Sequence, residues 1–293
     1  MLDLHFPTPS AQLLAPTKML LGYNTNGMAH HAPADAVALV ADLGYRGIGI
    51  TLDHGWLNPY STDFAAQVKL WRQWLQRYSL RSVIETGARF LLDPRAKHEP
   101  TLVTADASER SRRIDFYRRA IDLASELGSD CVSLWSGILH DKVDPTTAWA
   151  RLVSGLEQVV RHAERRGVVI GFEPEPGMFL ESMTQYDELR RRIDSPALQL
   201  TLDIGHLHCQ GETPLADYIT RYGSELVNVH LEDMRHGVHE HLQFGEGEID
   251  FPPVLAALRQ SNYQNGIYVE LSRHSHAAPT AAQHAIKFLN ALS

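Results

Sequence analysis

Short apolar runs alternate with amphipathic stretches along most of the chain. Eight of these runs are hydrophobic at nearly every position, which is typical of parallel strands covered on both faces. They lie at residues 19–23, 47–52, 81–86, 131–135, 168–173, 198–204, 226–231 and 266–271. Amphipathic segments fit between them, so the pattern predicts a strand and a helix repeated eight times.

The two longest predicted helices have clear end signals. One is predicted over 108–127, with Ser108 as its cap and Gly128 just after its end. The other begins after Asp144, which precedes a proline, and ends at Gly167. Shorter helices are predicted at 33–43, 62–78, 184–193, 214–222, 252–260 and 279–292. Arginines gather on several of these helices, and we expect them to lie on solvated outer faces.

Eight strand–helix units allow two architectures, a closed barrel or an open doubly wound sheet. The first run leads into GYNTNG, which is not the glycine-rich fingerprint of a dinucleotide-binding sheet. The count of eight favours an α/β fold of the (β/α)8 TIM barrel type in a single domain. We expect the barrel over residues 18–293, after an N-terminal extension at 1–17 without an assigned role. In such a barrel, function lies at the carboxyl ends of the strands.

Composition narrows the class of protein. The chain has 27 basic and 35 acidic residues, a formal net charge of -8, which disfavours a nucleic-acid partner. Its two cysteines cannot form a disulfide framework. We identify neither an apolar run as long as a membrane span nor a secretory signal. We therefore expect a cytoplasmic protein that binds no membrane.

Histidines are unusually frequent and unevenly placed. Six of the 16 lie within the 36 residues from His206 to His241. Histidine is the commonest metal ligand in proteins. The clustering indicates a metal site, although a chance grouping of surface histidines would look the same.

The ends of four consecutive predicted strands carry ionisable residues. These are Glu173, Asp203, His230 and Glu270. A carboxylate within an apolar run is costly unless it is paired or binds a metal. A metal site and a metal-free hydrogen-bonded ring both satisfy that requirement, and four such residues in series favour the metal. Three carboxylates and one imidazole suit Mn²⁺ or Mg²⁺, and catalytic zinc stays open.

Four motifs occur in order along the chain: LDIGH at 202–206, NVHLED at 228–233, FGEGEIDF at 244–251 and YVEL at 268–271. With these four motifs in this order, the chain resembles the xylose-isomerase-like barrel superfamily from about residue 18 to residue 292. Members include sugar isomerases and epimerases, inosose-processing enzymes, dehydroshikimate dehydratases and the endonuclease IV family. The motifs are specific for the superfamily and not for one reaction.

The resemblance implies one central divalent metal, Mn²⁺ first, with Mg²⁺, Co²⁺ or Zn²⁺ as alternatives. It implies Glu173, Asp203, His230 and Glu270 as ligands. In the epimerases the two metal-bound glutamates also move protons on opposite faces of the substrate, which here implies Glu173 and Glu270 as catalytic residues. Such a site forms an enediolate by removing a proton next to a carbonyl.

Other residues are expected around the substrate. His206 would lie near the substrate or join His239 and His241 in a second metal site, as the endonuclease branch implies; the alternative is that the latter two are loop residues. The third and fourth strand ends read Glu85-Thr86 and Trp135-Ser136, where the endonuclease supplies histidines. Arg235 stands beside the position where the epimerases commonly place an arginine. The expected substrate contacts are His206, Glu85, Trp135, Glu175 and Arg235.

The leading hypothesis is a metal-dependent isomerase or epimerase acting through an enediolate. Its partner would be a small polyhydroxy-carbonyl substrate, namely a sugar, a sugar phosphate or a cyclitol, and a homo-oligomer stays open. The first alternative is a lyase or dehydratase that eliminates water from the same intermediate. An endonuclease IV-like phosphodiester hydrolase and a non-catalytic carbohydrate-binding barrel are further alternatives.

Overall fold

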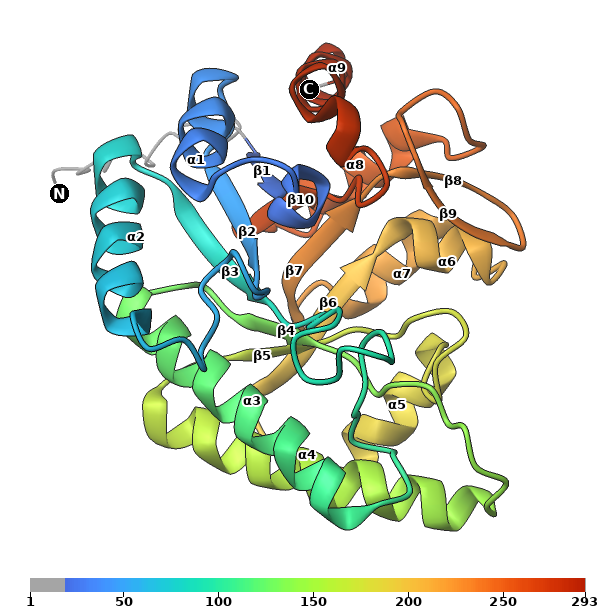
Figure 1. Ribbon diagram of the computed structural model, residues 1–293. Helices are drawn as coiled ribbons and strands as arrows, with labels where there is room; N and C mark the ends of the chain where they lie inside the picture. The colour runs from blue at the N-terminus through green and yellow to red at the C-terminus, as the bar shows by residue number, and fades with distance from the viewer. Residues whose placement is uncertain (1–18, 293) are drawn as a thin grey trace, which may run out of the picture.

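The computed structural model describes residues 19–292 and contains a closed barrel of parallel strands with helices around it (Figure 1). All eight predicted strands are present, which confirms the α/β barrel. In chain order they are β1 (Leu20–Asn24), β2 (Gly47–Thr51), β3 (Arg81–Glu85), β4 (Val132–Leu134), β5 (Ile170–Phe172), β6 (Leu198–Asp203), β7 (Leu226–Leu231) and β10 (Gly266–Val269). Strand β10 pairs with β1 and closes the barrel. The predicted extension at 1–17 lies outside the described residues.

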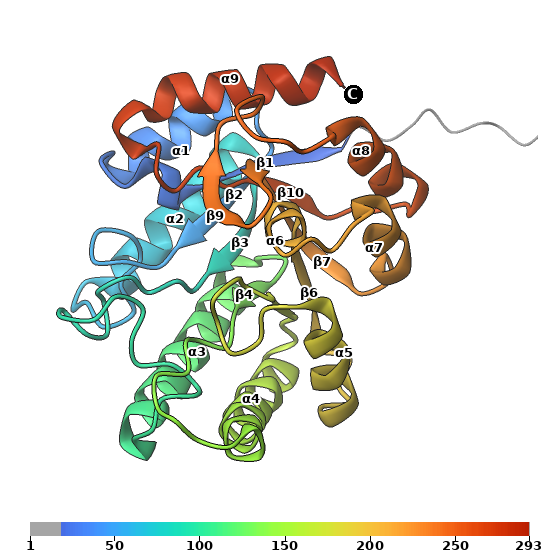
Figure 2. The same ribbon diagram turned by 90° about the vertical axis from the view of Figure 1, so that its right-hand side faces the viewer.

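Helices pack outside the strands, as the alternation predicts (Figure 2). They are α1 (Pro33–Asp42), α2 (Phe64–Tyr78), α3 (Ala107–Leu127), α4 (Pro145–Arg166), α5 (Met183–Arg192), α7 (Leu215–Tyr222), α8 (Phe251–Gln260) and α9 (Ala278–Ala291), with 3-10 turns η1 (Thr25–Met28) and η2 (Ser275–Ala277). No helix in the described part of the chain has the length and apolar character needed to cross a membrane.

Two elements over the carboxyl end of the barrel were not predicted. A short helix, α6 (Ile204–Cys209), follows β6 directly, and β8 (Asp233–Arg235) pairs antiparallel with β9 (Val238–Leu242). Both are short and rich in histidine, so they carry little of the apolar periodicity that identifies longer elements. The Asp233 carboxylate accepts hydrogen bonds from the backbone N–H groups of Gly245, Gly247 and Ile249, which ties the FGEGEIDF turn to the hairpin.

Helix α4 has the ends that the sequence indicates, with Asp144 as cap and Gly167 in the left-handed conformation. Helix α3 ends at Gly128 as predicted but begins earlier. Its cap is Asp106, whose carboxylate accepts hydrogen bonds from the backbone N–H groups of Ser108 and Glu109. The carboxylate outcompetes the Ser108 hydroxyl because it serves two unpaired donors at once.

One arginine of α3 contradicts the expectation of solvated outer faces. Arg113 is fully buried. Its guanidinium lies 4.5 Å from the ring centroid of Trp135 and 4.6 Å from that of Tyr117, and it donates to the Thr86 carbonyl at 2.9 Å. Aromatic faces replace part of the lost hydration, so this cation lies inside the protein against the barrel wall.

A tyrosine fills the amino-terminal end of the barrel interior. Tyr268 in β10 is fully buried, in a small cluster with Val83, Cys131 and Val227. A Cβ atom placed on Gly22 or on Gly266 would collide with its ring. The ring therefore requires strand positions without side chains beside it, which explains the glycines of β1 and β10.

We predict that Gly22→Ala lowers the free energy of unfolding by about 1–3 kcal/mol, because the added methyl group overpacks the interior against Tyr268. In a Tyr268→Leu background the same change should cost much less, as a double-mutant cycle by urea unfolding can measure. Gly55→Ala is the control, because Gly55 is exposed and no atom lies within 4 Å of its added Cβ. An equal loss in both backgrounds would contradict this packing.

Candidate metal centre

The carboxyl ends of the strands surround a cavity of about 610 Å³. Glu173 directly follows β5, Asp203 ends β6, His230 lies in β7 and Glu270 directly follows β10. Asp203 and His230 are register partners in neighbouring parallel strands. The backbone N–H of Glu173 donates to Leu134 on β4, which continues the ladder beyond the strand. The barrel thus brings together four residues that lie up to 97 positions apart in the chain.

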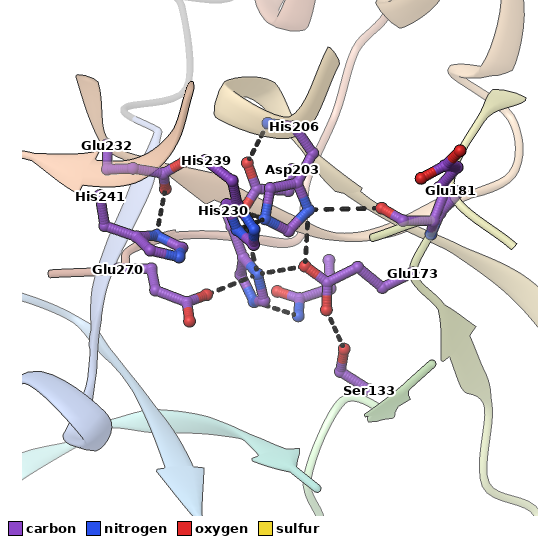
Figure 3. Close-up of polar contacts among 12 residues, drawn as sticks. Ser133, Glu173, Glu181, Asp203, His206, His230, Glu232, His239, His241 and Glu270 are labelled. Atoms are coloured by element: carbon purple, nitrogen blue, oxygen red, sulfur yellow. Dashed lines mark hydrogen bonds and ion pairs between the residues drawn. The ribbon is translucent and has the colours of Figure 1, made fainter. Parts of the chain in front are cut away.

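His230 lies at the centre of this group (Figure 3). Its Nδ1 atom is 2.9 Å from Glu270 Oε2, 3.1 Å from Glu173 Oε1 and 3.8 Å from Asp203 Oδ2. One ligand atom from each of the four residues lies within 4.8 Å of the others. The side chains of Asp203 and His230 are 0% and 1% exposed, so almost no water reaches them.

Charge in this group is far from balanced. Burial raises the pKa of the Glu173 carboxyl to about 7. Burial acts in the same direction on Glu270, but the combined attraction of His230, His241 and His206 brings the pKa of Glu270 below its usual range. Burial opposes protonation of His230, yet its neighbours Glu85, Glu173 and Glu270 raise its pKa well above the usual range. Counting Asp203, four carboxylates therefore share one imidazole.

The residues present fit a divalent cation. Asp203 Oδ2 is buried, with ring nitrogens of His206 and His230 at 3.5 and 3.8 Å, and its carboxylate shares a hydrogen bond with Glu232. These long contacts leave room for a cation that would stabilise the buried carboxylate. Three carboxylates and one imidazole are a donor set suited to Mn²⁺, Mg²⁺ or Zn²⁺.

The other ring nitrogen of His230 is held by Glu85. The two atoms, Nε2 and Oε1, are 3.0 Å apart, and Asn228 Nδ2 lies 3.1 Å from the same oxygen. A carboxylate on one imidazole nitrogen fixes the proton there and leaves the other nitrogen free to act as a ligand. The structure therefore places Glu85, a predicted substrate contact that also lines the cavity, where it orients His230.

Two asparagines orient Glu270. Asn26 Nδ2 donates to Glu270 Oε1 at 2.7 Å, and Asn24 Nδ2 donates to Oε2 at 3.3 Å. The sequence analysis missed both, although they are the polar residues of the GYNTNG segment at the end of the first predicted strand. Their position at the end of a strand was the only feature of the sequence that could have indicated a role in the site.

A second group of ligand atoms lies beside the first. His206 of α6 and His239 of β9 have their Nε2 atoms 3.1 Å apart, and His241 completes a group within 4.8 Å. His206 Nε2 is also 3.5 Å from Asp203 Oδ2, so Asp203 adjoins both groups. The structure thus brings together the three histidines predicted for a second metal.

Glu232 belongs to this second group and was missed. It is fully buried, its side chain shares a hydrogen bond with Asp203, and Oε2 is 3.9 Å from His241 Nδ1. Burial and the nearby Asp203 raise its pKa well above the usual range. A carboxylate directly after an apolar strand, two residues beyond His230, was a signal that the sequence analysis could have used.

The remaining predicted contacts divide between the cavity and the surface. Trp135 and Glu175 line the cavity, and burial together with Glu173 raises the pKa of Glu175 well above its usual range. Arg235 is exposed, donates to the Glu246 carbonyl at 3.2 Å and does not line the cavity. The prediction of a substrate contact for Arg235 does not fit this placement, because the hairpin holds its guanidinium on the adjoining turn.

Comparisons with known proteins give concordant results. The sequence model of the family described as xylose isomerase-like TIM barrel matches residues 37–292. The chain is 26% identical over 209 residues to L-ribulose-5-phosphate 3-epimerase UlaE of Shigella flexneri, covering 71% of this chain and 73% of that protein. It is 31% identical over 139 residues to inosose dehydratase of Clostridium beijerinckii, covering 42% of this chain and 46% of that protein.

Solved structures share the fold. D-allulose 3-epimerase from Methylomonas sp. in complex with D-allulose superposes with a TM-score of 0.75 at 20% identity, covering 95% of this chain and 98% of that one. The IOLI protein with a binding zinc atom gives a TM-score of 0.74 at 18% identity, covering 94% and 98%. With a closed eight-strand barrel and a family match over most of its length, the chain belongs to the xylose isomerase-like TIM barrel family.

Proposed function

We propose that this protein is a divalent-metal-dependent isomerase or epimerase of a sugar, sugar phosphate or cyclitol. The observation that carries the proposal is the pair of carboxylates on either side of His230, Glu173 at 3.1 Å and Glu270 at 2.9 Å (Figure 3). Both line one cavity of a size suited to a small polyhydroxy ketone. Relatives named as a ribulose-phosphate epimerase and an inosose dehydratase support this substrate class.

Glu173, Asp203, His230 and Glu270 would hold the metal, with Mn²⁺ the first candidate. When bound, a divalent ion would polarise the substrate carbonyl and stabilise the negative charge that develops on its oxygen. Glu85 and Asn228 keep the His230 ring in one orientation, and the two asparagines of GYNTNG keep Glu270 in place.

The two glutamates are the proposed proton carriers. One carboxylate oxygen removes the proton from the carbon next to the carbonyl, and the other glutamate returns a proton to the opposite face, which inverts the centre. Return by the same glutamate to the neighbouring carbon would give isomerisation. Departure of a β-hydroxyl as water would give a dehydratase, the runner-up that the inosose dehydratase relative supports.

We expect Asp203→Asn to bind the central ion at least about 10-fold more weakly, because it removes a buried anionic ligand. Metal content after dialysis, measured by inductively coupled plasma mass spectrometry, tests this. Asp217→Asn is the matched control, since Asp217 is exposed on α7. Equal metal content in the two variants would count against the assigned ligands.

We also propose that His206, His239 and His241 hold a second ion. His239→Ala should then lower the metal content by one ion per chain and leave the central ion bound, because it removes a ligand only from the second group. The same mass spectrometry tests this, with His284→Ala on α9 as control. A wild-type protein that never holds more than one ion would contradict the second site.

Proton transfer is tested by deuterium incorporation from D₂O into candidate ketoses, followed by NMR. Glu173→Gln and Glu270→Gln should each slow the exchange by about 10²–10⁴-fold, whereas Glu126→Gln on α3 should not. Because both glutamates are also proposed ligands, the exchange is measured with the metal in excess and the metal content of each variant is determined. Slow exchange in a variant that still holds the ion then reports the loss of the base. Exchange that persists in both glutamate variants would overturn the mechanism, and water loss would favour the dehydratase.

A further inference from the structure

The wall of the cavity between β3 and α3 carries positive charge that the proposed proton transfer does not use. Arg89 and Lys97 both line the cavity there. The backbone N–H of His98 donates to the Arg89 carbonyl at 2.5 Å, which closes the loop and holds the two cations near each other. We call residues 87–98 the cationic loop.

A third cation lies behind this wall. The fully buried Arg113 stacks on Trp135, and the other edge of Trp135 meets the His98 ring with centroids 5.5 Å apart. The guanidinium hydrogen-bonds to the Thr86 carbonyl and to the Tyr117 side chain, and no carboxylate of the described residues forms an ion pair with it. Because a buried charge without a counter-charge is poorly screened, its field extends to the adjacent cavity.

Little negative charge offsets these cations locally. Arg89 has one ionic contact, Nη1 to Asp53 Oδ2 at 3.5 Å, and donates through Nη2 to the Asn26 carbonyl at 2.8 Å. Lys97 is exposed and pairs with no carboxylate within the described residues. Burial lowers the pKa of His98 to about 4, and the charges of Lys97, Arg113 and Arg89 act in the same direction.

Three of the four acidic residues that line the cavity are engaged elsewhere, and burial raises the pKa of the fourth, Glu175, well above its usual range. Glu85, Glu173 and Glu270 all contact His230. Arg273, a further cation of the cavity lining, is paired with Glu240 at 3.1 Å and is more than half exposed. The cavity therefore has a carboxylate-rich centre and, at the cationic loop, a wall whose positive charge is offset only by Asp53 beside Arg89.

We propose that the substrate carries an oxyanion, a phosphate or a carboxylate, that binds at the cationic loop through Lys97 and Arg89. The inference rests on the proposed function, which assigns the carbonyl end of the substrate to the carboxylate-rich centre. Ammonium and guanidinium groups form short charge-assisted hydrogen bonds to such oxygens. A neutral sugar would leave Lys97 without a charged partner and Arg89 with only its long contact to Asp53. The buried Arg113 adds attraction without contact.

Calorimetric titration of the metal-loaded enzyme tests this with three ketoses: L-ribulose, L-ribulose 5-phosphate and 5-keto-D-gluconate. We expect at least one anionic ketose to bind about 10-fold or more tightly than the neutral one. Lys97→Met should weaken the binding of that ketose by about 5–10-fold, because it removes one charged hydrogen bond, and should leave the affinity for the neutral ketose unchanged. Lys69→Met on α2 is the charge-matched control and should change neither. Tighter binding of L-ribulose 5-phosphate would indicate a phosphate, and tighter binding of 5-keto-D-gluconate would indicate a carboxylate.

The inference would be overturned if the anionic ketoses bound no more tightly than L-ribulose. In that case, deuterium exchange into L-ribulose would still support the proposed function. Tight binding of an anionic ketose without exchange would count against the function alone. Inorganic phosphate, followed by phosphorus NMR, is a probe that requires no matching sugar. If no ketose binds, the phosphate titration decides. The inference is then overturned if phosphate does not bind to the wild type, or if it binds equally well to the wild type and to Lys97→Met.

Discussion

The structure depends on the burial of three carboxylates around one imidazole. Glu173, Asp203 and Glu270 are drawn from three strands to His230, and none of the three can be hydrated as it would be in water. Burial of ionised carboxylates is tolerated only with compensating charge or hydrogen bonds. His230 and the two asparagines beside Glu270 supply part of it, whereas Glu85 behind His230 adds a further carboxylate.

The cavity at the end of the closed barrel has, beside these carboxylates, two different walls. The β8–β9 hairpin and α6 add three histidines beside Asp203, while the β3–α3 segment adds cations. A ligand that spans the cavity therefore meets oxygen ligands at one end and charged donors at the other. The proposed choice of an anionic substrate rests on this division of charge and not on the shape of the cavity alone.

Much of the fold and part of the site could be predicted from the sequence. The apolar runs identify the strands, and Glu173, Asp203, His230 and Glu270 stand out because charge is rare at the end of such runs. Helix α6 and the hairpin were missed because they are too short to show a period. Asn24 and Asn26 were missed because neutral amides at a strand end are ordinary, and only their contact with Glu270 makes them important.

By itself, the sequence determined the barrel and the four strand ends that carry ionisable groups, since both follow from local hydrophobic patterning. Only the tertiary structure decided which ring nitrogen of His230 faces which carboxylate, that Glu232 adjoins the second histidine group, and that Arg235 lies apart from the cavity. It also decided that Arg113 is buried behind Trp135. These are relations between distant segments, and their energies depend on distances and burial that residue spacing does not specify.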